Sequence, residues 1–247
     1  MFYTDIGDLL ILFWKTIQQL PQAWRHRRKI FEQLFEIGNA SLFMVGLLSF
    51  FIGGVLALQT GPVFKDRGVV SFVGGMVGLA MAKELGPVMI AIMIAGRVGS
   101  AMAAEIGSML IYQEIDALKT MNINPIRFLV LPRFVAIAIA MPCLVVLATL
   151  VGWIGGAVVS VANSEIALSF DGYFNSLKDM VGPMDMLNGS IKTLVFSQII
   201  VFVSCHQGLN TIGGPRGVGR SVTKAVVNSI ILILIADYFL TRLMIKW

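Results

Sequence analysis

The sequence predicts an all-α membrane protein with an N-terminal interfacial amphipathic helix and five transmembrane helices. Of its 247 residues, 57% are hydrophobic and only 13% are charged, and the mean hydropathy is +0.83. A soluble domain carries about a quarter of charged residues, so this composition disfavours an ordinary soluble protein. Several apolar stretches are also long enough for the roughly 20 helical residues that cross a bilayer.

The first 36 residues are expected to form an amphipathic helix at the membrane interface. Apolar residues recur at steps of four and three residues from Ile6 to Trp24, and a basic run from Arg25 to Lys29 follows. An apolar face with aromatic residues beside a basic run is typical of a helix that lies among anionic lipid headgroups. The alternative is an ordinary amphipathic helix that packs against the flank of the protein itself.

Residues 37–247 are expected to form one membrane domain, whose first span covers about residues 37–60. The second apolar stretch, about residues 69–109, would be roughly 60 Å long as one helix, which is twice the thickness of the hydrocarbon core. Because Pro87 cannot donate a backbone hydrogen bond, we expect this helix to break or kink just after Glu84. One broken span gives five spans in total, whereas a hairpin at this point would give six.

Three further spans are expected at about residues 134–162, 190–207 and 222–244. A polar outer loop, about residues 163–189, joins the first two of them, and a Gly-rich inner loop, residues 208–220, joins the last two. In this arrangement eleven Lys and Arg residues lie on the inner side, six lie on the outer side and two lie within the membrane. Since cytoplasmic loops carry an excess of Lys and Arg, the N-terminus is predicted inside and the C-terminus outside.

Small residues on the second span predict close packing against other helices. Gly74 and Gly78 lie four residues apart, and small residues recur near one helical face from Gly96 to Gly107. Such faces let two backbones approach closely within a lipid bilayer.

Charged residues inside the predicted spans must be paired or hydrated, because each costs roughly 2.5–3.5 kcal/mol at the bilayer centre. Lys83 and Glu84 are adjacent in sequence and do not face each other on a helix, so each is expected to find a different partner. Arg97 and Glu105 are expected to form structural ion pairs with other spans or with a second copy of the chain. Asp237, in the last span, is expected to pair within the bundle.

A polar segment, about residues 112–121, is expected to form a short helix outside the bilayer. Ile115, Leu118 and Met121 recur at three-residue steps, which gives one apolar edge suited to a groove on a partner protein. Asn122 and a following Asn and Pro stop the helix. The residues assigned to this contact are Gln113, Glu114, Ile115, Asp116, Leu118 and Met121.

Four motifs around this segment are similar to one known family. They are ELGPV (84–88), AGRVGSAMAAEIG (95–107), IDAL (115–118) and NPIRFLVLPR (124–133). They resemble the MlaE/YrbE permeases, which are the membrane subunits of MCE-type ABC transporters that move phospholipid across the Gram-negative envelope. The resemblance extends from about Phe35 to the C-terminus, so residues 37–247 are interpreted as the permease domain.

The resemblance implies a multi-pass protein of the bacterial inner membrane that works as a homodimer. It implies three kinds of partner: a phospholipid substrate, a cytoplasmic ABC ATPase subunit docked on residues 112–121, and a periplasmic MCE-domain protein. Candidate lipid-binding residues are Lys83, Glu84, Leu85 and Lys192. The alternative for Lys192 is a lysine that snorkels to the interface. No catalytic residue, cofactor, metal or nucleic acid is expected, and relatives usually carry an arginine where Leu110 stands.

Three other functions are weighed against this interpretation. The segment from Gly214 to Ser221 resembles a phosphate-binding loop with Arg in place of Lys, but such a loop follows a strand, and a flexible inner loop is the simpler interpretation. A membrane enzyme would need a nucleophile–base or metal constellation, which the sequence lacks. A stand-alone ion-coupled transporter could move protons through Glu84 and Asp237, but it would usually show paired repeats.

Overall fold

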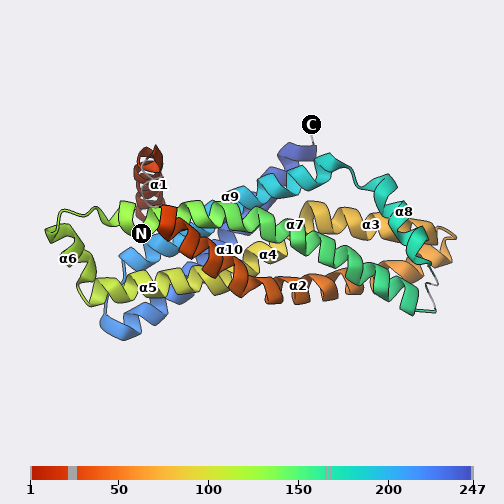
Figure 1. Cartoon of the computed structure of the whole chain (residues 1–247), viewed down its shortest axis with the longest axis horizontal. Coiled ribbons are helices and arrows are strands. Elements are labelled where there is room, and N and C mark those ends of the chain that lie inside the picture. Colours follow the sequence, from red (N-terminus) through yellow and green to blue (C-terminus); the bar gives the residue numbers. More distant parts are fainter. Residues whose placement is uncertain (1, 22–26, 165, 167, 246–247) are drawn as a thin grey trace. The chain divides into compact units, whose positions relative to one another are not determined.

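A computed structural model of the chain describes residues 2–21, 27–164, 166 and 168–245, and the regular elements in these residues are helical (Figure 1). In chain order they are α1 (Phe2–Gln18), α2 (Arg27–Asp66), η2 (Val70–Phe72), α3 (Val73–Ala80), η3 (Met81–Leu85), α4 (Gly86–Ile94), η4 (Ala95–Gly99), α5 (Ser100–Ile111), α6 (Glu114–Thr120), η5 (Ile126–Val130), α7 (Leu131–Ala162), α8 (Phe170–Met180), α9 (Pro183–Leu209) and α10 (Gly214–Ile245).

Five helical runs in the described residues are long and apolar enough to cross a membrane. They are Arg27–Asp66, Val70–Ile111, Ile126–Ala162, Pro183–Leu209 and Gly214–Met244. This arrangement confirms the predicted all-α fold with five spans.

The second span, Val70–Ile111, is one helical run, so the hairpin that would have given six spans is wrong. The irregularity expected near Pro87 takes the form of the π-helical turn η3, which separates α3 from α4. The chain reaches Pro87 through η3, a π-helical turn that ends two residues before it. A proline ring normally clashes with the carbonyl four residues earlier, and a wider turn relieves that clash. The same arrangement recurs at Pro132, two residues after the π-helical turn η5.

The N-terminal segment is not the single helix that was predicted. α1 ends at Gln18 and residues 27–36 already belong to α2, so the described part of this segment contains residues of two helices. The apolar side chains of Leu10 and Trp14 on α1 are each 63% exposed, which agrees with a helix in the membrane interface. The predicted residues Trp24, Arg25 and His26 lie outside the described residues.

Two predicted loops are largely helical. The outer loop expected at residues 163–189 contains α8 and the first turns of α9, which begins at Pro183. The inner loop expected at residues 208–220 shrinks because α10 begins at Gly214. Hydropathy marks the part of a helix that crosses the bilayer, whereas backbone hydrogen bonding continues beyond that part. The predicted spans are therefore shorter than the helices in the structure.

The chain divides into two compact units. Unit 1 comprises residues 1–40, 91–141 and 194–246, and unit 2 comprises mainly residues 41–90 and 142–193. Each unit has its own packing, and several of the long helices contribute residues to both.

Unit 2 is built on close contacts between backbones. A Cβ atom on Gly53 of α2 would collide with the carbonyl of Gly152 on α7, and one on Gly74 of α3 would collide with the carbonyl of Tyr173 on α8. Gly78 also packs against α8, through Leu177. The predicted packing role of Gly74 and Gly78 is therefore confirmed, and small residues allow these helices to approach closely.

Unit 1 packs α5 and η4 against α10. On α5, Ala103 is fully buried and a Cβ atom on Gly107 would lie 2.8 Å from the Thr211 hydroxyl oxygen. Gly96, which was expected on the same face, is exposed and has no neighbour within 4 Å of an added Cβ atom. Gly96 lies within the π-helical turn η4 rather than in α5, and the wider turn places this glycine off the packed face.

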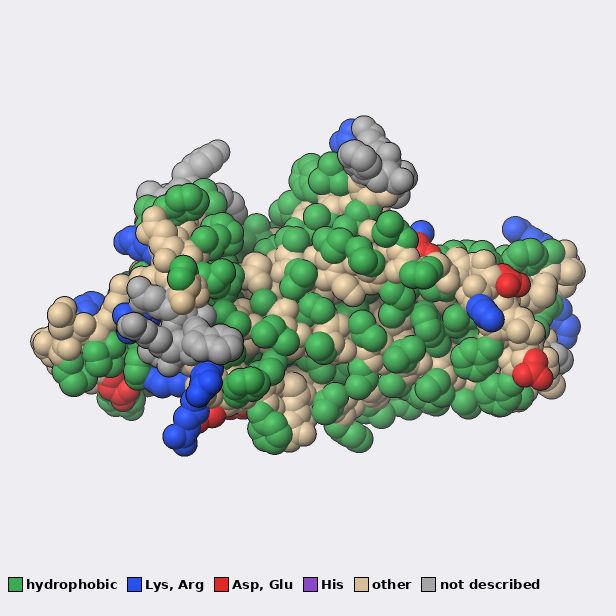
Figure 2. All heavy atoms as spheres, turned by 45° about the horizontal axis from the view of Figure 1, so that its top comes forward, with side chains coloured by type: hydrophobic (Ala, Val, Ile, Leu, Met, Phe, Trp, Pro, Cys, Tyr) green, Lys and Arg blue, Asp and Glu red, His purple; other side chains and the backbone are tan. Residues whose placement is uncertain are grey.

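The exposed surface is strongly apolar. Hydrophobic side chains cover much of the face shown in Figure 2, and Phe43 of α2, Ile154 of α7 and Leu234 of α10 are 78%, 50% and 51% exposed. A soluble monomer rarely exposes a contiguous apolar patch larger than a few hundred Å². Lipid is the solvent that suits such a surface.

Candidate functional site

Two charged residues of the second span meet α9 within unit 2. Lys83 Nζ lies 2.9 Å from Asp185 Oδ1, and Lys192 Nζ donates to Glu84 Oε2 at 2.7 Å. The prediction that adjacent Lys83 and Glu84 have different partners is confirmed. Asp185 and Lys192 are seven residues apart, or about two helical turns, and therefore share one face of α9. We call these four residues the paired-charge site.

The two ion pairs differ in how deeply they are buried. The Lys192 side chain is only 3% exposed, whereas its partner Glu84 is 41% exposed. In the other pair Lys83 is 48% exposed and Asp185 is 16% exposed. The snorkelling alternative for Lys192 is therefore wrong, because a snorkelling ammonium would reach water. The pair of Lys192 and Glu84 therefore joins a buried cation to an accessible anion, whereas the pair of Lys83 and Asp185 joins a more exposed cation to a more buried anion.

Gly189 brings α9 close enough for these contacts. It lies between Asp185 and Lys192, and a Cβ atom here would collide with the carbonyl of Ala82 and lie 3.3 Å from Cγ of Pro87. A larger side chain would push α9 away from η3 and lengthen both ion pairs. The glycine therefore sets the distance between the helices that carry the four charges.

Asp185 is also fixed at the start of α9. Its Oδ2 accepts a hydrogen bond from the backbone amide of Gly182 at 2.8 Å, while Oδ1 faces Lys83. A carboxylate in the first turn satisfies an amide that the helix leaves without an internal partner. The side chain is therefore oriented before any ligand arrives.

Leu85 lies beside the paired-charge site and is half-buried. It packs against the unit 2 core that includes Met81 and Tyr173. The structure therefore gives Leu85 a packing role, and its contact with lipid stays a prediction.

A third ion pair lies in unit 1. Arg133 Nη2 donates to Glu105 Oε2 at 2.6 Å, and Arg133 Nη1 donates to the carbonyl of Leu129 at 3.1 Å. The Arg133 side chain is 9% exposed and that of Glu105 is 50% exposed. The expected ion pair between Glu105 and another span is confirmed, and its partner is on α7.

The remaining two membrane charges also lie in unit 1. Arg97 is in η4 and Asp237 is half-buried on α10. Both residues have interaction partners in the structure. Their predicted structural roles stay predictions.

The predicted coupling segment forms α6, but its apolar edge is partly wrong. Ile115 and Leu118 are only 2% and 8% exposed, so they pack against the chain itself, whereas Met121 is 61% exposed. Left-handed backbone at Gln113 and Asn122, with φ of 59° at each, bounds the helix, and the predicted stop at Asn122 is confirmed. Because α6 is so short, packing of its apolar side must hold it in place.

Sequence reasoning missed one residue of the paired-charge site and the glycine that sets its spacing. Asp185 was assigned to a polar loop, and Gly189 was not singled out. The spacing offered a signal, because Asp185 precedes Lys192 by seven residues, as expected for one helical face. Lys83 in the membrane also required an acidic partner.

No group of three or more His, Cys, Asp or Glu residues suited to hold a metal ion occurs within the described residues. The segment from Gly214 to Ser221 is the first part of α10. It therefore lacks the strand-to-helix context that a phosphate-binding loop requires.

Comparison with known proteins extends over nearly the whole chain. A family model described as Permease MlaE matches residues 30–243. A probable ABC transporter permease protein of Rickettsia felis is 38% identical over 245 residues, which are 99% of this chain and 94% of that protein. The intermembrane phospholipid transport system permease protein MlaE of Haemophilus influenzae is 31% identical over 244 residues, which are 98% and 93% of the two chains. The chain therefore belongs to the MlaE permease family and is a multi-pass, non-catalytic permease subunit of an ABC transporter.

Proposed function

We propose that this permease moves phospholipid between the inner membrane and the periplasmic side, driven by a separate ATPase subunit. The name of the Haemophilus influenzae relative, an intermembrane phospholipid transport permease, supports the substrate. By the family resemblance, two copies of this chain, cytoplasmic ATPases and a periplasmic MCE-domain protein would complete the transporter.

The ion pair between Lys192 and Glu84 is the observation that carries the proposal. A buried ammonium is strongly destabilised without a partner of opposite charge, so Lys192 must hold either Glu84 or another anion. The phosphate of a lipid headgroup is such an anion, and a lysine meets phosphate as a point charge. Because Glu84 is 41% exposed, a headgroup can approach from the side on which this carboxylate lies.

Phosphate binding to Lys192 would release Glu84 from its pair. A headgroup that also carries an amine supplies a new partner for the freed carboxylate. The second pair, Lys83 with Asp185, offers the same combination of charges beside the first and keeps the local net charge at zero. Reversible exchange of ionic partners would allow a lipid to enter and leave without covalent chemistry.

The rival functions lose support. An ABC permease draws its energy from a partner ATPase, so a stand-alone ion-coupled transporter that uses Glu84 and Asp237 is no longer needed to explain the membrane charges. A membrane enzyme has no support either, because the relatives over the whole chain are named as permeases.

We assign α6 and its flanks as the contact with the ATPase, with a different face from the one predicted. Buried Ile115 and Leu118 anchor α6 to unit 1, so a force on α6 reaches the membrane helices. The exposed face carries Tyr112 and Met121, which are 72% and 61% exposed, with the acidic side chain of Glu114 beside them.

Lipid transport by the reconstituted complex tests the substrate assignment. Lys192→Met should lower bound phospholipid and transport at least tenfold, or about 1.4 kcal/mol, because the headgroup loses its buried cation. Lys178→Met on α8 is the matched control, since this lysine is exposed. If Lys192→Met assembles and transports lipid at the rate of the control, the assignment fails.

The coupling contact has its own test. Met121→Glu should release the ATPase or uncouple ATP hydrolysis from transport, because it places a charge in the proposed interface. Met184→Glu is the control, since Met184 is similarly exposed, at 67%. It lies on the opposite side of the membrane from α6 in the predicted topology. Normal ATPase binding and transport in the Met121 variant would remove α6 from the interface.

A further inference from the structure

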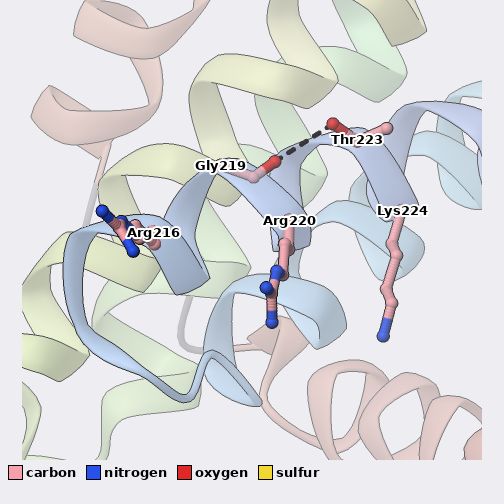
Figure 3. A pocket seen from close by; sticks show the side chains of 5 residues that line it. All are labelled: Arg216, Gly219, Arg220, Thr223 and Lys224. Atoms are coloured by element: carbon pink, nitrogen blue, oxygen red, sulfur yellow. Dashed lines mark hydrogen bonds between the residues drawn. The ribbon is translucent and has the colours of Figure 1, made fainter.

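The beginning of α10 carries a cluster of three cationic residues that the transport mechanism does not use. Arg216, Arg220 and Lys224 follow one another at steps of four residues and are all exposed. With Gly219 and Thr223 they line an open hollow of about 460 Å³ (Figure 3).

No acidic side chain is close in sequence to this cationic hollow. From Met186 to Ala236 the chain contains no Asp or Glu, so no neighbour on α10 before Asp237 can neutralise the three charges. Figure 3 shows Arg220 and Lys224 pointing the same way from α10, with Arg216 one turn earlier. Three like charges along one face repel one another, and a bound anion would relieve that repulsion.

The cations themselves are the groups available to an anion. The Thr223 hydroxyl already donates to the carbonyl of Gly219 at 3.1 Å. Recognition would therefore depend on guanidinium and ammonium groups, which bind phosphate through charge-assisted hydrogen bonds. Arg216 and Arg220 can each offer a planar fork of donors to phosphate oxygens.

The surroundings identify the kind of anion. The face that bears Lys224 continues along α10 through Val227 and Ile231, which are each 48% exposed and lie three and seven residues further on. Exposed apolar side chains that follow directly on cations are the pattern of a helix leaving the bilayer core for the headgroup layer. The cations span eight residues, or about 12 Å along the axis, so they lie at headgroup depth.

We propose that the cationic hollow on α10 binds the phosphate of an anionic phospholipid in the surrounding leaflet. This lipid is held at the edge of the permease and is separate from the transported lipid of the paired-charge site. An acidic surface of a partner protein would suit the charges but not the continuous apolar face below them, so lipid is the ligand that fits both features.

Lipid selectivity of the full-length chain with its copurifying subunits tests this site. The complex is placed in phosphatidylcholine nanodiscs, and its preference for spin-labelled phosphatidylglycerol over spin-labelled phosphatidylcholine is measured. Each cation near a membrane surface contributes about 1 kcal/mol, so Arg220→Gln should lower the preference about fivefold and the triple variant R216Q/R220Q/K224Q on the order of a hundredfold.

A matched triple variant controls for net charge. K65Q/R67Q/K178Q removes three other exposed cations, each of which has an acidic neighbour in sequence, at Asp66 or Asp179. This control should keep the preference for phosphatidylglycerol. Equal losses in both triple variants would overturn the proposal, because they would show a general charge effect.

Two further outcomes would also overturn it. If soluble glycerol phosphate displaces spin-labelled phosphatidylglycerol at equal concentration, the hollow binds a soluble phosphate compound rather than a membrane lipid. If R216Q/R220Q/K224Q keeps its lipid preference but loses the ATPase subunit, the hollow is a protein contact. Lipid transport through Lys192 is a separate readout, so failure of this site does not decide the transport proposal.

Discussion

Replacement of Gly189 by alanine is expected to disturb the paired-charge site without removing any charge. The new methyl group would collide with the Ala82 carbonyl and press on Pro87. Overpacking of a tight contact costs about 1–3 kcal/mol, while the better helix propensity of alanine returns about 1 kcal/mol. The net destabilisation is therefore about 0–2 kcal/mol, and α9 should move away from η3.

Gly46→Ala is the matched control for this change. Gly46 lies on α2 with nothing within 4 Å of an added Cβ atom, so this variant gains the helix propensity of about 1 kcal/mol without a collision. Gly189→Ala should therefore be about 2 kcal/mol less stable than the control, which corresponds to a difference of about 4–8 °C in the thermal midpoint.

Thermal unfolding in detergent and bound phospholipid per complex measure the two effects. Because Gly189 sets the distance between both pairs of charges, Gly189→Ala should lower bound phospholipid while Gly46→Ala leaves it unchanged. Equal thermal midpoints and equal lipid content in the two variants would show that the close approach of α9 does not hold the site together.

Three further predictions follow from the structure. Glu105→Gln should destabilise the protein by about 3 kcal/mol, because the buried guanidinium of Arg133 loses its charged partner. The double variant Glu105→Gln with Arg133→Leu should recover part of this loss, as measured by thermal unfolding. Burial raises the pKa of Tyr173 above the ordinary phenol value. The buried neutral phenol should therefore contribute its full share of folding stability below a pH of about 10, and this contribution should be lost as the pH rises further. Tyr173→Phe, which removes a buried hydroxyl without a hydrogen-bond partner, should weaken this alkaline loss in a pH series of unfolding curves. A reporter fused to the N-terminus should read cytoplasmic and one fused after Trp247 should read periplasmic, and a cytoplasmic reading at both ends would contradict the charge distribution.

The sequence was sufficient to predict features that depend on hydropathy. Spans are recognised because a bilayer demands about 20 apolar residues, and the separate partners of Lys83 and Glu84 follow from helix geometry alone. The irregularity expected near Pro87 is present as η3, but its form was not predictable, because the sequence does not show that a π-helical turn will take up the strain.

Features that depend on contacts between distant residues were not predictable in the same way. Ile115 and Leu118 form an apolar edge on any short helix, and the pattern cannot tell whether a partner or the chain itself covers that edge. Asp185 looked like a loop residue because polar residues surround it, although it starts α9. Gly189 has meaning only once Ala82 is known to lie against it.

The π-helical turns impose a rule for reading substitutions and length changes in this chain. In a π-helical turn the backbone hydrogen bond joins residues five apart instead of four, so the turn holds one extra residue. One residue corresponds to about 100° around the helix axis. Deletion of a single residue within η4 would remove that offset and rotate α5 by the same angle relative to α4. Glu105 would then leave Arg133 on α7, and Gly107 would leave Thr211 before α10, although all of these residues are intact. The second span is therefore less tolerant of a one-residue deletion than of most substitutions, and alignments of its relatives should keep its length fixed.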